Sequence, residues 1–178
     1  AGFGEGMIAI FADRLVKEGL SFEEIIAKTE GYLSTVRSEF TVNSIKYLAN
    51  TGRISNFKAT IADVLNIKPL LYGSNEGKIV PFANVRGRKN ALKKLSENVA
   101  MNIANKDETI YITHCNALED AKFFERLLHE KGIFHTEIYY FDLVTGAHVG
   151  PGTIAVFYEG NNRNISRKSL IQTILGKK

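Results

Sequence analysis

Residues 109–141, TIYITHCNALEDAKFFERLLHEKGIFHTEIYYF, contain the pattern that decides the fold. The short apolar run at 109–113 is typical of a buried strand, and residues 117–131 have the spacing of a helix that closes at Gly132. A second strand is predicted at 134–141. A strand, a helix and a strand in succession predict that the two strands are parallel neighbours in one sheet.

Downstream, the chain continues with a loop, a strand and a tail. The glycine-rich segment DLVTGAHVGPG, residues 142–152, predicts a loop, and the apolar run TIAVFY, residues 153–158, predicts a last strand. The remaining residues 161–178 form a basic tail. Apolar residues recur there at helical spacing, so we expect a helix near residues 166–175.

Upstream, two apolar runs flank a short turn. IKPLLY at 67–72 and KIVPFANV at 78–85 are separated by GSNEG, which predicts an antiparallel hairpin. Pro81 has no N–H for a ladder hydrogen bond, so the second strand is expected to be an edge strand or to carry a bulge. A helix is predicted at 87–104. Parallel and antiparallel pairs together predict an α/β fold, with a mixed β-sheet and helices packed against it.

The first third of the chain is predicted to be mainly helical. The glycines of residues 2–6 predict a turn before an amphipathic helix. Ser21 and Glu24 have the spacing of a capping box, which predicts the start of a second helix. Further elements are expected at 36–42 (strand), 43–50 (short helix) and 56–66 (helix).

The formal charge of +4 is concentrated at the C-terminus. The last 20 residues hold five Lys or Arg and one acidic residue, and the rest of the chain is balanced. The basic charge therefore belongs to a tail and does not indicate a nucleic-acid-binding body. Hydrophobic residues make up 44% of the chain, which excludes a disordered or collagen-like protein.

The number and spacing of cysteines and histidines argue against disulfides and metal sites. Cys115 is the single cysteine, so the chain has no intrachain disulfide and no cysteine zinc cluster. A reducing, cytoplasmic location is expected. The four histidines lack metal-ligand spacing, so we predict no metal site. No apolar run approaches the roughly 20 residues that cross a bilayer, so no stable membrane insertion is expected.

Three segments carry candidate functional residues. His148 lies among glycines, and its ring could donate to an anion or simply lie at the surface of a tight loop. Arg53 follows a helix end and could clamp an anion, or be a surface arginine beside the helix cap Ser55. The basic stretch 78–94 could contact nucleic acid, or form a solvated face.

Three motifs in this order resemble the DegV family of bacterial fatty-acid-binding proteins. They are LANTGRIS at 48–55, the KPLL strand with GKI and the helix RGRKNAL at 68–92, and AHVGPGT at 147–153. The resemblance implies a two-domain protein that holds a long-chain fatty acid and presents its carboxylate to a separate ATP-dependent kinase subunit for acyl-phosphate formation. It implies that the chain itself is not an enzyme and needs no cofactor.

The resemblance also implies a domain assignment. Residues 1–160 correspond to the C-terminal domain of the two-domain fold. The N-terminal lipid-gripping domain is expected to be missing from this sequence, because the chain has no initiator Met and begins in a glycine-rich stretch. Residues 161–178 form the tail beyond the family match.

The resemblance assigns roles to individual residues. His148 and Arg53 are expected at the carboxylate end of the fatty acid, so we predict that they converge in space. Arg86 is expected on the face that meets the kinase partner, or near the carboxylate. Apolar residues are candidates for the lining of the acyl tunnel, although core packing explains them equally well: Ile54, Ile61, Leu65 and Phe82.

Two other functions compete with the lipid carrier. A stand-alone small-molecule kinase or transferase is one, but the chain has no phosphate-binding loop motif and no acidic cluster suited to magnesium. A nucleic-acid-binding module that uses the 78–94 stretch is the other. It predicts binding that weakens steeply with salt.

Overall fold

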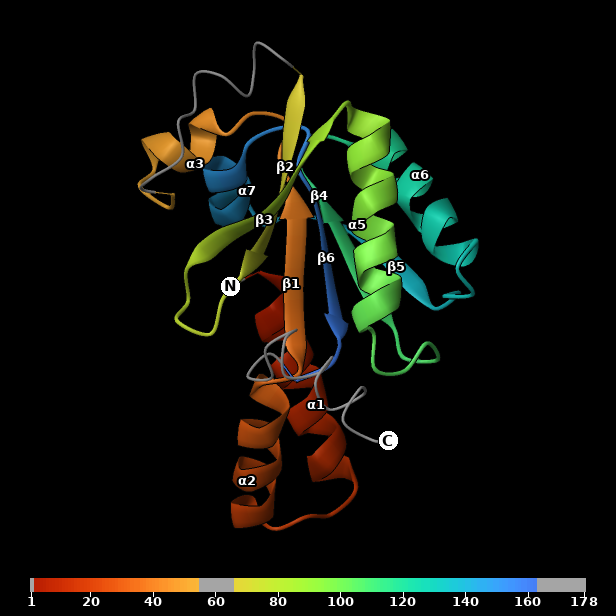
Figure 1. Cartoon of the computed structure of the whole chain (residues 1–178). Coiled ribbons are helices and arrows are strands. Elements are labelled where there is room, and N and C mark those ends of the chain that lie inside the picture. Colours follow the sequence, from red (N-terminus) through yellow and green to blue (C-terminus); the bar gives the residue numbers. More distant parts are fainter. Residues whose placement is uncertain (1, 55–65, 163–178) are drawn as a thin grey trace, which may run out of the picture.

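The computed structural model describes residues 2–54 and 66–162 (Figure 1). The residues between and beyond these ranges include the expected helices at 56–66 and 166–175 and the candidates Ile61 and Leu65, which therefore lie outside the described residues. The elements are α1 (Phe3–Lys17), α2 (Phe22–Leu33), β1 (Val36–Thr41), α3 (Lys46–Asn50), β2 (Ile67–Gly73), β3 (Ile79–Arg86), α5 (Arg88–Asn102), β4 (Ile110–His114), α6 (Leu118–His129), β5 (Thr136–Tyr140), α7 (Leu143–Val149) and β6 (Ile154–Glu159).

The strands form one mixed sheet with the order β3-β2-β1-β6-β4-β5. β4 and β5 pair in parallel, as the strand–helix–strand pattern predicted, and the other neighbours pair antiparallel. The hairpin of β2 and β3 is confirmed. Pro81 lies on the edge strand, next to the register shift that follows Leu70, so the sequence indicated both features correctly.

Each face of the sheet carries its own hydrophobic core. α5 and α6 cover one face, where apolar side chains of both helices pack on alternate residues of the strands, such as Ile112 and Val156. α1, α3 and α7 contribute to the core on the other face, which includes Phe40 and Phe157. This alternation is the period-2 geometry of a strand that is covered on both sides.

One edge of the sheet collects most of the connecting segments. The register pairs Thr41 with Ile154, Ile67 with Arg86, and His114 with Tyr140. β1, β3, β4 and β5 therefore end at the same edge at which β2 and β6 begin. We call it the α7 edge, because α3 and α7 lie there, whereas the α1–α2 hairpin projects from the opposite end (Figure 1).

The structure corrects the expected turn at residues 2–6. α1 begins at Phe3, so Gly4 and Gly6 are helical, and only Gly2 of the three has a positive φ, 66°. A Cβ at residue 4 would lie 3.5 Å from Phe157 and 3.6 Å from Val36. The first turn of the helix lies against the sheet, where an added Cβ would make only ordinary van der Waals contacts. A pattern of glycines alone does not reveal that these residues are helical.

Candidate functional site

His148 lies on α7, a short helix, and not in the loop that the glycine-rich sequence predicted for residues 142–152. Asp142 caps this helix, because its Oδ1 accepts a hydrogen bond of 2.8 Å from the backbone N–H of Thr145. Gly150, with φ 77° and ψ 167°, ends it. An N-cap aspartate and a terminating glycine are ordinary helix signals, but a run of only seven residues with an internal glycine obscured them.

We expect Asp142→Ala to reduce the free energy of unfolding by about 1 kcal/mol, because the helix that carries His148 loses its N-cap. The hydrogen bonds from Thr145 lower the pKa of Asp142, so its contribution is present above the unfolded pKa and is lost as the pH falls through the lowered folded value. Asp142→Asn, which keeps an acceptor, is the matched control. Thermal unfolding at pH 7 measures both variants, and an alanine variant as stable as asparagine would contradict the cap assignment.

The imidazole of His148 is half-buried, and its Nδ1 is buried without a hydrogen-bond partner among the described residues. A buried ring nitrogen is costly to leave unpaired. Such an atom is suited to donate to, or accept from, a polar group brought to this edge. The role of His148 stays a prediction, and the structure adds that one of its ring nitrogens is buried.

The segment that follows α7 is held in close contact with the chain after β1. A Cβ at Gly150 would lie 2.3 Å from the ring of Tyr47, and a Cβ at Gly152 would lie 2.6 Å from Asn43. Both glycines have positive φ. The glycines of the AHVGPGT motif are therefore required by close packing and by backbone conformation. The backbone N–H groups of Gly150 and Gly152 donate within the chain, to the carbonyls of Gly146 and Cys115.

The same segment is also anchored by hydrogen bonds. The backbone N–H of Gly152 donates to the carbonyl of Cys115 at 2.7 Å, and the N–H of Cys115 donates to the carbonyl of Thr153 at 3.0 Å. The hydroxyl of Thr153 donates to the carbonyl of Val149, one residue beyond His148, at 2.9 Å. The position of His148 thus depends on a network that reaches from α7 to the end of β4.

Arg53 lies in the turn after α3, and α3 packs against α7. Its side chain is exposed, and its Nη1 donates to the carbonyl of Thr51 at 2.6 Å. Arg53 and His148 therefore lie on neighbouring elements of the α7 edge, but the guanidinium of Arg53 donates to a carbonyl of its own turn. Their convergence on one ligand stays a prediction.

Arg86 and Arg88 are two residues apart but have different environments. Arg86 is exposed at the end of the edge strand β3. Arg88, in the first turn of α5, is mostly buried: its Nε donates to Asp120 at 2.8 Å and its Nη2 donates to the carbonyl of Gly152. Arg86 was the candidate from the sequence and Arg88 was not, although a cation in the first turn of a helix opposes the macrodipole and is therefore unusual there.

The rest of the basic stretch 78–94 is mostly a solvated surface. Lys78, Lys89 and Lys93 are exposed, and Lys94 forms a surface ion pair with Glu97 at 3.0 Å. No stacking aromatic residues alternate with these lysines, and stacking is the usual means of holding single-stranded nucleic acid.

The two tunnel candidates that the structure describes lie on opposite faces of the sheet. Ile54 packs against the core that contains Phe40, and Phe82 packs against the core under α5 and α6. The structure does not bring these two side chains together, because the sheet separates them.

His114 and Cys115 have separate partners and do not form a nucleophile–base pair. His114 Nδ1 accepts a hydrogen bond from the backbone N–H of Ala117 at 3.2 Å, and its ring packs against Tyr140. Burial lowers the pKa of His114 and raises the pKa of Cys115, which opposes an imidazolium–thiolate pair. Residues 2–54 and 66–162 contain no group of three or more His, Cys, Asp or Glu that could hold a metal ion.

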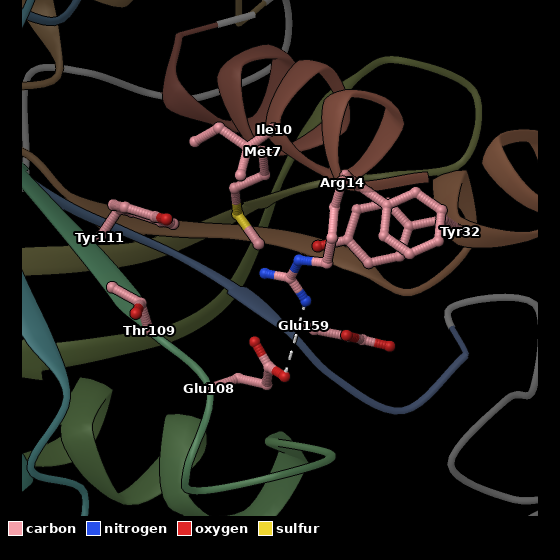
Figure 2. A pocket seen from close by; sticks show the side chains of 9 residues that line it. Met7, Ile10, Arg14, Tyr32, Glu108, Thr109, Tyr111 and Glu159 are labelled. Atoms are coloured by element: carbon pink, nitrogen blue, oxygen red, sulfur yellow. Dashed lines mark ion pairs between the residues drawn. The ribbon is translucent and has the colours of Figure 1, made fainter. Parts of the chain in front are cut away.

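A cavity of about 60 Å³ lies at the opposite end of the sheet from His148, between the α1–α2 hairpin and the ends of β4 and β6 (Figure 2). Arg14 approaches Glu108 to 4.0 Å there, and Glu159 lies beside them. Burial and the nearby Glu108 carboxylate raise the pKa of Glu159, and burial raises the pKa of Tyr32 to about 12. The cavity lies where the α1–α2 hairpin meets the sheet, and it is remote from the candidate site.

We expect Glu159→Gln to stabilise the protein at pH 8 and to have little effect at pH 4. The folded pKa of Glu159 is raised, so its contribution to stability is complete below the unfolded value near 4.5 and declines as the pH rises through the folded value. Glutamine removes the ionised form that is poorly tolerated near Glu108. Thermal unfolding across this pH range tests the prediction, and a lower melting temperature of the variant at pH 8 would contradict it.

None of the helices within the described ranges is long and apolar enough to cross a membrane.

Three comparisons with known proteins agree with this geometry. The family model of the DegV family of uncharacterised proteins matches residues 1–161. A DegV domain-containing protein of Clostridium perfringens is 36% identical over 165 residues, which are 92% of this chain and 57% of that protein. The chain thus spans little more than half the length of this relative.

Two solved structures share the fold. A DegV family protein from Streptococcus agalactiae, described as fatty acid binding, is 34% identical and superposes with a TM-score of 0.79 over 88% of this chain and 56% of its own. The fatty acid kinase B3 protein of Streptococcus pneumoniae, loaded with linoleic acid, has a TM-score of 0.79 at 20% identity and covers 90% of this chain and 57% of its own. The second likeness shows the fold alone.

Proposed function

The chain belongs to the DegV family, and on that premise we propose that it is the C-terminal part of a fatty-acid carrier whose α7 edge holds the lipid carboxylate. The observation that carries the proposal is His148: one ring nitrogen is buried and lacks a described partner, on a helix fixed by capping and close glycine packing. The 34% identical Streptococcus agalactiae protein is described as fatty acid binding, which supports the ligand class.

The chemistry of the edge suits a carboxylate. A carboxylate that leaves water needs donors or a cation, and the α7 edge provides a histidine with Arg53 on the adjacent turn. Hydrogen bonds to a charged group are stronger than those between neutral groups, so one imidazole donor is expected to contribute measurably to affinity.

The polypeptide that contains this chain, purified with whatever flanking sequence its natural form has, tests the proposal. We expect it to bind oleate labelled with ¹³C at the carboxyl carbon, and His148→Ala to weaken binding by about 10- to 100-fold, since a hydrogen bond to a charged group is lost. His135→Ala, an exposed histidine at the other end of the sheet, is the matched control. The proposal is falsified if the wild-type protein gives no shift of the carboxyl signal and native mass spectrometry shows no bound acyl chain.

We further propose that the carrier does not transfer the phosphoryl group and presents the carboxylate to a separate ATP-dependent kinase subunit. The support for this step is the motif resemblance, because the likeness to the pneumococcal kinase protein shows only the fold. Exposed Arg86, at the same edge as His148, is available to meet such a partner.

The kinase step has its own assay. ATP, the kinase subunit and the lipid-loaded carrier together should yield an acyl phosphate that hydroxylamine traps as a hydroxamate, and omission of the kinase subunit should abolish it. Arg86→Glu should slow hydroxamate formation without changing oleate affinity, whereas Lys78→Glu, an exposed cation on the turn at the other end of the hairpin, should not. Hydroxamate formed by the carrier and ATP alone would show that the chain is itself the kinase.

A further inference from the structure

We propose that Arg88 is a positioning residue for His148, which it holds in place through the segment that follows α7. The expected effect on fatty-acid affinity rests on the proposed function. The expected effect on the position of His148 can be measured without any lipid. Arg88 does not contact the histidine, and it acts on the backbone that carries it.

Arg88 joins three elements that are distant in sequence. Its guanidinium projects from the first turn of α5, where Nε donates to Asp120 of α6 and Nη2 donates to the carbonyl of Gly152 after α7. The side chain is 18% exposed. An arginine fork can hold two acceptors in fixed directions at once, and a lysine ammonium on a shorter reach cannot reproduce both.

Hydrogen bonds and short stretches of backbone together connect Arg88 to the turn that carries His148. Gly152, whose carbonyl Arg88 binds, donates its own N–H to Cys115 at 2.7 Å. The next residue, Thr153, donates its hydroxyl to the carbonyl of Val149 at 2.9 Å. Any shift of Gly152 therefore changes the last turn of α7, where His148 lies.

Asn43 packs closely against Gly152 and limits how far this residue can move. Asn43 occupies the space where a Cβ of Gly152 would stand, at 2.6 Å. Lys68 in turn donates to the carbonyl of Asn43 at 2.8 Å and to its Oδ1 at 2.9 Å. The segment is thus held both by the hydrogen bond from Arg88 and by close packing on Asn43, which Lys68 fixes in turn.

The start of α5 does not by itself favour an arginine at this position. α5 has no acidic residue in its first turn and no side-chain cap, so a cation at Arg88 faces the positive end of the helix dipole. The Nη1 of Arg88 is also buried without a hydrogen-bond partner among the described residues. A cation at a helix N-terminus and a buried unpaired nitrogen are both locally unfavourable. Unfavourable features of this kind are expected mainly at functional sites.

The test uses Arg88→Gln and Arg88→Lys in the full polypeptide that carries this chain. Lys93→Gln is the matched control, because Lys93 is an exposed cation on the same helix. The first readout is the pair of ¹⁵N imidazole signals of His148 at fixed pH without lipid, and the second is the affinity for oleate. Thermal unfolding is recorded for every variant.

Arg88→Gln is expected to displace the His148 signals and to weaken oleate binding about tenfold, with Arg88→Lys intermediate and Lys93→Gln like the wild type. His148 signals that stay unchanged in a folded Arg88→Gln protein would overturn the proposal, even if the melting temperature falls. Should the glutamine variant not fold, Arg88→Lys decides: displaced signals support the role, and wild-type signals refute it. If His148 shifts but the wild type binds no oleate, the positioning role stands and the proposed function fails.

Discussion

Gly150→Ala is expected to reduce the free energy of unfolding by about 2–5 kcal/mol, because it combines backbone strain with overpacking. The residue has φ 77° and ψ 167°, a region that is open essentially to glycine alone. Its Cβ would lie 2.3 Å from Cδ2 of Tyr47 and 2.4 Å from Cγ, so the clash is with the base of the ring and not with a flexible end. Urea unfolding followed by circular dichroism measures the loss.

Gly87→Ala separates the two contributions. Gly87 has a similar backbone, φ 84° and ψ 142°, but the contact nearest to its Cβ is an ordinary 3.8 Å to Asn90. Its alanine variant should therefore show the backbone cost without the clash. Equal losses at both positions would contradict the packing argument, and partial recovery of Gly150→Ala by Tyr47→Ala would support it.

The second large effect is expected at Glu39, where alanine should cost about 3–5 kcal/mol of unfolding free energy, because partners in the core lose their acceptor. The carboxylate, 2% exposed, lies between β1 and α5. Oε2 accepts from the amide of Asn98 at 2.6 Å, Oε1 accepts from the phenol of Tyr158 at 2.9 Å, and Arg37 lies 3.8 Å away.

Two further variants separate the effect of the buried hydrogen bonds of Glu39 from the effect of removing any glutamate. Glu97→Ala removes an exposed carboxylate on α5 that forms a surface pair with Lys94, and should cost at most about 1 kcal/mol. Tyr158→Phe removes one donor, so its effect should be smaller in the Glu39→Ala background than in the wild type. Additive losses in that double-mutant cycle, measured by urea unfolding, would show that the two side chains are not coupled.

Patterns of short range predicted most of the fold. The strand–helix–strand run at 109–141 led to the parallel pair β4 and β5, and the hairpin was predicted with Pro81 as the sign of an edge strand or a bulge, both of which are present. The capping box of Ser21 and Glu24 is present, with both of its reciprocal hydrogen bonds. These features depend on residues close in sequence, so periodicity and turn chemistry suffice to find them.

The errors came from glycines whose role depends on distant residues. Gly4 and Gly6 suggested a turn, but they lie within α1, where Gly4 faces Phe157 and Val36. The glycines around His148 suggested an open loop, but α7 occupies residues 143–149. Propensity disfavours glycine in a helix by only about 1 kcal/mol, which tertiary packing readily outweighs.

The sequence by itself determined most of the helices and strands along the chain and the family resemblance, and it singled out His148 as a candidate, because each depends on local patterns or on a short motif. Only the tertiary structure decided which arginine reaches the segment that carries His148. Arg86 and Arg88 are the same residue type only two positions apart, and the sequence does not distinguish them. In the structure Arg86 is exposed at the end of β3. Arg88, in the first turn of α5, reaches Asp120 and Gly152, which are 32 and 64 residues away. Contacts over such separations arise from how the elements pack across the sheet, and no local pattern encodes them.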